Sequence, residues 1–154
     1  MNRFTGSVQY TYLANGLAFA SHSVRFYFDD ECEGEYIEIQ RGQLSNFASV
    51  PKIFIWLFKP DGNDIKMPAF FHDGLISEFG QQLWILEDNK NGNPIRVRIP
   101  DWNESALWFR KMIQIRQRAT RNKKPKWLKF LLAGVDFLFR WSCWFAVVVH
   151  GQFK

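Results

Sequence analysis

Cysteine and histidine are scarce in this chain of 154 residues, which holds two of the first and three of the second. Cys32 and Cys143 have the spacing of neither a zinc site nor a CxxC redox motif, and none of His22, His72 and His150 has metal-ligand spacing to another histidine. We therefore expect no bound metal. For the cysteines we expect free thiols in a reducing compartment, with one disulfide as the alternative.

An uninterrupted apolar run is also missing near the N-terminus. The first residues, MNRFTGSVQYTYLANG, lack the apolar core of a secretory signal peptide. A disordered polymer is excluded, because 47% of the residues are apolar and 18% are aromatic. The length suits one domain, so we expect residues 1–154 to form a single domain with a substantial core.

Acidic residues are absent from 110–129, although the chain as a whole carries a formal charge of only +5. Such a basic block is suited to phosphate, a membrane surface or an acidic protein, and the simpler interpretation is a solvated helix end. Nucleic-acid binding ranks as a less favoured hypothesis, because most aromatic residues nearby follow the block instead of alternating with its charges. Its candidate binding residues are Arg116, Arg118, Arg121, Lys123, Lys124, Lys126 and Trp127.

Hydrophobic periodicity predicts an α+β fold with a β-rich N-terminal half. Alternating apolar residues predict a hairpin across 24–40. QLWILE and PIRVRI flank DNKNGN, which predicts a second hairpin across 82–99. RGQLSN, between these hairpins, is expected to be a loop.

Three helices are predicted to pack against the strands, at about 66–79, 103–119 and 127–149. The first is expected to start near Pro68 and to stop before a glycine. Asp101 or Asn103 is expected to cap the second helix, since both are good N-cap residues.

The last predicted helix raises the question of a membrane. Residues 127–149 are long enough to span a bilayer, but they include Lys129, Asp136 and Arg140. A charge near the centre of a span costs about 2.5–3.5 kcal/mol, and Asp136 and Arg140 have the spacing of a helical ion pair. We favour a core helix, with a helix on a membrane surface as the alternative.

Several motifs occur in a fixed order: a β-rich start, GQLSNFASVP, then PDG, then MPAFFHDGLI. Over about residues 22–153 the chain resembles a family of uncharacterised proteins common in tailed bacteriophages and prophages, known only as a domain of unknown function. That family reads like GFxTDxASVP, a Pro-Gly turn and AAxxHDxLY, followed by a helix with an Ala-Asp-x-x-Phe signature. The resemblance implies a phage structural or accessory protein, in the virion or the host cytoplasm, that assembles with other phage proteins. It implies no reaction.

The chain departs from that pattern at several polar positions. Ser45 and Asn46 stand where the family has Thr-Asp, and Ile76 replaces the tyrosine. The aspartate of the second helix falls on Ser105 or Ala106. A carboxylate, a phenol and a second carboxylate that could serve chemistry are therefore missing at these positions.

His72 and Asp73 are the most informative pair in the sequence. A histidine that activates water needs an acceptor on its second ring nitrogen, but adjacent helical residues point about 100° apart, so Asp73 is badly placed to orient His72. The pair resembles the His-Asp pair of calcium-dependent secreted phospholipases. That resemblance implies a small hydrolase acting on lipid or cell envelope, with His72 as base and Asp73 or Asp101 assisting. Calcium would be the cofactor of such an enzyme, but no Gly-rich calcium loop is recognisable, so no cofactor is predicted.

The alternative role of the pair is structural. His72 is then a buried histidine bonded to a backbone carbonyl, and Asp73 holds the preceding loop through its backbone N–H groups. The loop residues concerned are Asn46, Ala48, Ser49 and Pro51. We favour this interpretation, in which the protein acts through contacts and not through catalysis.

Overall fold

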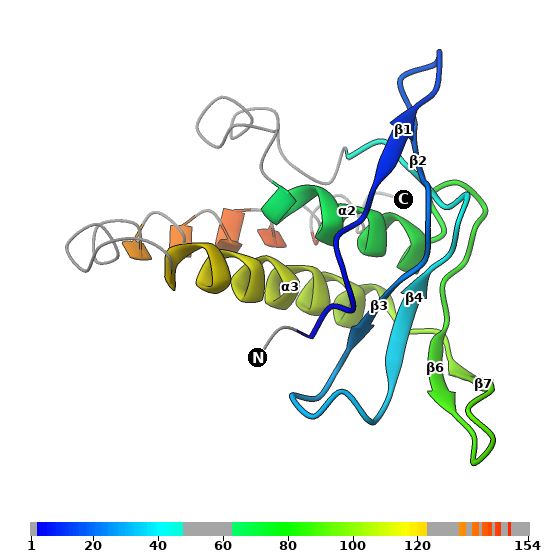
Figure 1. Ribbon diagram of the computed structural model, residues 1–154. Helices are drawn as coiled ribbons and strands as arrows, with labels where there is room; N and C mark the ends of the chain where they lie inside the picture. The colour runs from blue at the N-terminus through cyan, green and yellow to red at the C-terminus, as the bar shows by residue number, and fades with distance from the viewer. Residues whose placement is uncertain are drawn as a thin grey trace.

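The computed structural model describes residues 3–47 and 63–122, and in the C-terminal segment residues 133, 134, 137, 138, 140–142, 144, 145 and 148. Within these residues the chain forms two antiparallel sheets with helices packed against them (Figure 1). The predicted α+β fold is confirmed.

The smaller sheet is formed by β1 (Tyr10–Tyr12), β2 (Ala18–Ala20) and β5 (Leu44–Ser45), in the order β1-β2-β5. β5 lies within RGQLSN, so the prediction of a plain loop there is wrong. Its short extended segment pairs with β2, with Ala18 opposite Ser45. Because β2 and β5 are far apart in the sequence and β5 is only two residues long, no alternation of apolar and polar residues could have predicted this pairing.

The larger sheet has the order β3-β4-β6-β7. It contains β3 (Val24–Tyr27), β4 (Tyr36–Ile39), β6 (Ile85–Asp88) and β7 (Pro94–Arg98). β3 pairs with β4 and β6 pairs with β7, both antiparallel, so both predicted hairpins are confirmed.

Short polar side chains hold the two hairpin turns. Asp29 accepts hydrogen bonds from the backbone N–H groups of residues 32–34. Asn89 Oδ1 accepts bonds from the N–H groups of Asn91 and Asn93, each 2.9 Å long. Aspartate and asparagine favour turns because they satisfy the backbone locally in this way.

A bulge interrupts the second hairpin. Ile85 lies opposite Arg98, whereas Leu86 lies opposite Arg96, so Val97 is an extra residue on β7. All the residues of β7 are exposed, and Figure 1 shows the β6–β7 hairpin projecting beyond the helices. The alternation of PIRVRI therefore does not place one face of β7 in the core.

The first described helix, α2, spans Asn63–Leu75, so it begins and ends earlier than predicted. It starts before Pro68, which lies inside the helix. The chain leaves the helix through Ser77, whose φ of 55° is left-handed, while the N–H of Glu78 bonds to the carbonyl of Asp73 at 2.9 Å. This i to i+5 closure resembles a helix C-cap and ends the helix before the predicted position.

The second described helix, α3, spans Trp102–Asn122. Asp101 caps it, as one of the two predicted alternatives: its Oδ1 accepts a 2.7 Å bond from the N–H of Glu104. α2 packs against α3 on one side and against β4 and β5 on the other.

The C-terminal residues that the structure describes are all helical, as predicted for this segment. Trp144 and Val148 pack against buried residues of α2 and α3, whereas Phe137, Leu138 and Phe145 are exposed. In the described part of the chain, no helix is long and apolar enough to cross a membrane. Lys129 and Asp136 lie outside the described residues, and Arg140 donates to the Gln117 side chain.

Aromatic side chains fill the core between the larger sheet and the helices. Phe26 of β3 is fully buried and lies 4.8 Å from Phe4, 6.1 Å from Phe71 of α2 and 6.0 Å from Trp108 of α3, measured between ring centroids. Much of the aromatic content noted in the sequence therefore stabilises the fold.

Candidate functional site

His72 and Asp73 lie in the last turn of α2 and are almost completely buried. Their side chains are 3% and 2% exposed. Nδ1 of His72 is 3.8 Å from Oδ1 of Asp73, which is longer than a hydrogen bond. This distance agrees with the expectation that neighbouring helical residues are badly placed to orient each other.

Asp73 connects α2 to the end of β5. Its Oδ2 accepts a 2.6 Å hydrogen bond from the hydroxyl of Ser45, and that hydroxyl accepts a 3.1 Å bond from the N–H of Phe47. Within the described residues, Asp73 thus reaches the loop through the side chain of Ser45. The direct bond from Asp73 to the loop backbone stays a prediction, because most of that loop lies outside these residues. Asn46 is exposed at this point, and the motif residues Ala48, Ser49 and Pro51 lie outside the described residues.

Aromatic rings of α3 surround the ring of His72. Trp102 lies edge-on at 6.1 Å and Phe109 lies tilted at 5.0 Å, measured between centroids. Ser105 and Ala106, where the resemblance expects a carboxylate, are buried on the same helix. The hydroxyl of Ser105 donates a 2.8 Å bond to the carbonyl of Asp101.

Asp101 occupies a different environment from His72 and Asp73. It is exposed, and its carboxylate is engaged as the N-cap of α3. Of the three residues predicted to be catalytic, the structure thus brings two together in the interior and places the third at a helix terminus.

Gly74 lets the chain return close to this cluster. The N–H of Leu83 bonds to the carbonyl of Gly74 at 2.8 Å. A Cβ at position 74 would lie 2.6 Å from two carbon atoms of the Leu83 side chain, which is closer than real contacts allow. A Cβ at the glycine of the HDG sequence would therefore force its neighbours to shift.

The described part of the basic block does not form one cluster of free cations. Arg110 stacks over Trp141 at 4.1 Å, Lys111 over Trp108 at 4.5 Å and Arg116 over Phe4 at 5.8 Å. Burial lowers the pKa of Lys111. Arg118 is exposed and Arg121 belongs to the last turn of α3, while the remaining candidates lie outside the described residues: Lys123, Lys124, Lys126 and Trp127.

A metal site is not formed by the residues that the structure describes. Within them, no three side chains of histidine, cysteine, aspartate and glutamate are grouped so that they could hold an ion. Cys32 is a free thiol at the β3–β4 turn, and Cys143 lies outside the described residues.

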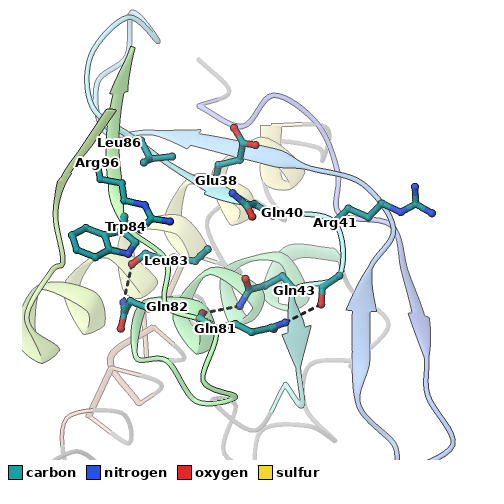
Figure 2. A pocket seen from close by; sticks show the side chains of 11 residues that line it. Glu38, Gln40, Arg41, Gln43, Gln81, Gln82, Leu83, Trp84, Leu86 and Arg96 are labelled. Carbon is teal, nitrogen blue, oxygen red and sulfur yellow. Dashed lines mark hydrogen bonds between the residues drawn. The ribbon is translucent and has the colours of Figure 1, made fainter. Parts of the chain in front are cut away.

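A pocket of about 270 Å³ lies on the outer face of the larger sheet (Figure 2). Leu86 and Arg96 are opposite each other on β6 and β7 and point to this face, away from the buried Ile85. Trp84 and the glutamines at 40, 43, 81 and 82 complete most of the wall.

Sequence reasoning missed this pocket. Its glutamines come from the β4–β5 turn and from the segment before β6, which are distant in the sequence. The only available signal was QQLW, a polar pair beside a tryptophan, and such a tetrapeptide is not specific for any site.

The comparisons with known proteins identify a family and no activity. Residues 23–147 match the family described as protein of unknown function (DUF1353). No curated protein and no solved structure is matched by the chain.

Proposed function

The chain belongs to the DUF1353 family of proteins of unknown function, and we propose that it is a bacteriophage structural or accessory protein that acts through protein contacts. In this proposal His72 and Asp73 stabilise the fold and perform no chemistry. The phage assignment rests on the resemblance of the ASVP and HD motifs, and the non-catalytic role rests on the geometry around them.

The burial of His72 is the observation that carries the proposal. A general base must lie within hydrogen-bond reach of the proton that it removes from a substrate or a water molecule. At 3% exposure, with Trp102 and Phe109 against its ring, His72 has almost no surface to offer a substrate. Asp73 is engaged by Ser45, on the side of the cluster toward β5. These contacts favour a structural role for His72 and Asp73 over the catalytic role suggested by their resemblance to the phospholipase pair.

Exposed apolar side chains of the C-terminal helical residues offer a contact surface. Phe137, Leu138 and Phe145 are 52%, 67% and 64% exposed, and Trp141, beside them in the helix, is 38% exposed. Leu107 of α3 is also exposed, one turn before Arg110, which stacks on Trp141. Apolar side chains gathered in this way mark interaction sites more often than isolated ones do.

The test places variants of the gene in a phage or prophage that carries it. We expect mass spectrometry to detect the protein in purified particles. We expect Leu138→Glu and Phe145→Glu to lower its incorporation and the plating efficiency. A matched control is Leu13→Glu, which places the same charge on an exposed leucine of the β1–β2 turn.

His72 variants separate the proposal from the hydrolase. His72→Gln and His72→Phe should keep incorporation and plating efficiency near wild type, provided that thermal unfolding shows a folded protein. A folded His72 variant that loses function while Leu138→Glu keeps it would contradict the proposal, as would absence of the protein from particles. Salt-dependent binding of the purified chain to duplex DNA would instead favour the nucleic-acid alternative.

A further inference from the structure

The pocket on the outer face of the larger sheet has a polar wall of unusual composition. Four glutamines line it, together with one tryptophan, and an amide group carries both donors and an acceptor. Pockets for apolar cofactors are lined mostly by aliphatic and aromatic residues. This wall instead suits a ligand whose polar groups both donate and accept hydrogen bonds.

Hydrogen bonds to the backbone hold three of the amides in place, those of Gln43, Gln81 and Gln82. Gln43, which is 6% exposed, donates to the carbonyl of Gln81 at 3.2 Å. Gln81 accepts from the N–H of Leu44 at 2.7 Å and donates to the carbonyl of Gly42 at 3.3 Å. Since these groups are already ordered, a ligand would lose little free energy in fixing them.

Some hydrogen-bonding capacity of the wall remains open. Gln82 uses its amide N–H groups on the carbonyls of Leu75 and Leu83, at 2.9 and 2.7 Å. Within the described part of the chain, no hydrogen bond ends on the side-chain oxygen of Gln82 or of Gln43, and Gln40 is exposed. Within these residues, the two ordered amides of Gln43 and Gln82 thus each keep an unused acceptor, and Gln40 keeps an exposed amide.

Trp84 and Arg96 form one end of the pocket. The guanidinium of Arg96 lies 5.2 Å from the centre of the Trp84 ring, and Figure 2 shows the two side chains together with Gln82 nearby. Arg96 lies over one face of the ring and Trp84 is half-buried, so the part of the ring that stays exposed is a fixed apolar area beside hydrogen-bonding groups. The C–H face of a sugar ring needs such a surface, while its hydroxyl groups need donors and acceptors.

The charges at the rim leave a small positive excess. Glu38 accepts a 2.6 Å ion-paired hydrogen bond from Arg25, so its charge is largely compensated. Arg96 has no carboxylate partner within the described residues, and Arg41 lines the opposite end of the pocket with its side chain extended outward (Figure 2). With so small a positive excess, the pocket does not favour a simple anion as its ligand. A carboxylate group on a sugar would still interact favourably with Arg96.

We propose that the pocket formed by Trp84, Arg96 and the glutamines at 40, 43, 81 and 82 binds one ring of a carbohydrate. The hydroxyl groups of the ring bond to the amides, and one of its apolar faces contacts Trp84. The proposal is independent of the role of His72 and Asp73, because the pocket and that pair share no residue.

The experiment is a titration of the isotope-labelled full chain, followed by NMR of the glutamine side-chain amides and the Trp84 indole N–H. The probes are maltotriose as a neutral sugar, trigalacturonate as an acidic sugar and sodium acetate as a carboxylate without a sugar ring. We expect saturable shifts of the pocket signals with at least one trisaccharide, with a Kd on the order of 1 mM. Stronger binding of trigalacturonate than of maltotriose would assign the acidic class.

Matched variants test whether binding occurs in this pocket. Trp84→Ala and Gln40→Ala are each expected to weaken binding about tenfold. Gln9→Ala, which removes an exposed glutamine near β1, should leave the Kd unchanged. Absence of pocket shifts with both trisaccharides would overturn the proposal. Equal binding of acetate, unaffected by Trp84→Ala, would also overturn it and leave a simple anion site.

Discussion

The cluster around Asp73 and the pocket beside Trp84 both consist of hydrogen-bonded polar side chains, yet their exposure differs. Asp73 and Ser45 are buried and bond to each other. Gln40 and Arg96 are exposed, and the side-chain oxygen of the ordered Gln82 has no hydrogen-bond partner within the described residues. A buried polar group must find its partner within the protein, whereas one at a surface hollow can keep capacity for a ligand. We therefore expect the first region to contribute to stability, and we propose the second as a binding site.

The largest loss of stability is expected for a substitution in the buried cluster around Asp73. Gly74→Ala places a Cβ 2.6 Å from the side chain of Leu83, so either that buried side chain or the helix α2 must shift. Overpacking of this kind costs about 1–3 kcal/mol, and we expect the upper part of that range. Urea unfolding measures it. The control is Gly6→Ala, where a Cβ meets nothing within 4 Å and the cost should be within about 0.5 kcal/mol of zero.

A somewhat smaller effect is expected at the bond between α2 and β5. Ser45→Ala removes the donor to Asp73, in a buried bond, and the acceptor for the N–H of Phe47, in a partly buried one. Loss of a partner for buried polar groups costs about 1–3 kcal/mol, and we expect about 2 kcal/mol. Chemical denaturation of Ser45→Ala against Ser7→Ala, which changes an exposed serine, measures the difference. Equal stability of the two variants would show that the hydroxyl does not hold the loop.

The smallest expected effect lies on the outer face of the sheet and depends on pH. Burial, and then the hydrogen bond to Asp88, raise the pKa of Tyr36 above its ordinary value of 10. The folded state thus favours the protonated phenol. Its contribution is fully present below pH 10 and is lost as the pH rises toward the folded-state pKa.

Tyr36→Phe should therefore cost about 1 kcal/mol at neutral pH and should reduce the loss of stability above about pH 10. Urea unfolding at neutral and alkaline pH gives both quantities. Tyr12→Phe, on an exposed tyrosine, is the control. If Tyr36→Phe and wild type lose stability in parallel above that pH, the phenol is not the responsible group.

Local patterns predicted most of the elements. The β3–β4 hairpin follows from the alternation of Val24 and Phe26 with polar neighbours, and the β6–β7 hairpin from the Asn-Gly turn. Asp101 as a helix cap is equally local, since its side chain reaches only the next turn. The end of α2 was placed too late, because the left-handed Ser77 is not marked by residue type.

Non-local contacts escaped sequence reasoning. β5 depends on pairing with β2, and the bulge at Val97 depends on the register between β6 and β7. The fixing of Asp73 through Ser45 joins residues 28 positions apart. No local pattern records such partners, so the sequence indicated an important pair at His72 and Asp73 without showing what each side chain touches.

Periodicity, turn chemistry and short motifs were enough to predict the class of fold, the hairpins and the family pattern around ASVP and HD. The packing of His72 against Trp102 and Phe109, and the meeting of glutamines from two separate segments beside Trp84, depend on the folded chain. The reason is physical. Burial and pockets arise where segments that are distant in the sequence come together on folding, and the residues next to a position in the sequence do not reveal those contacts.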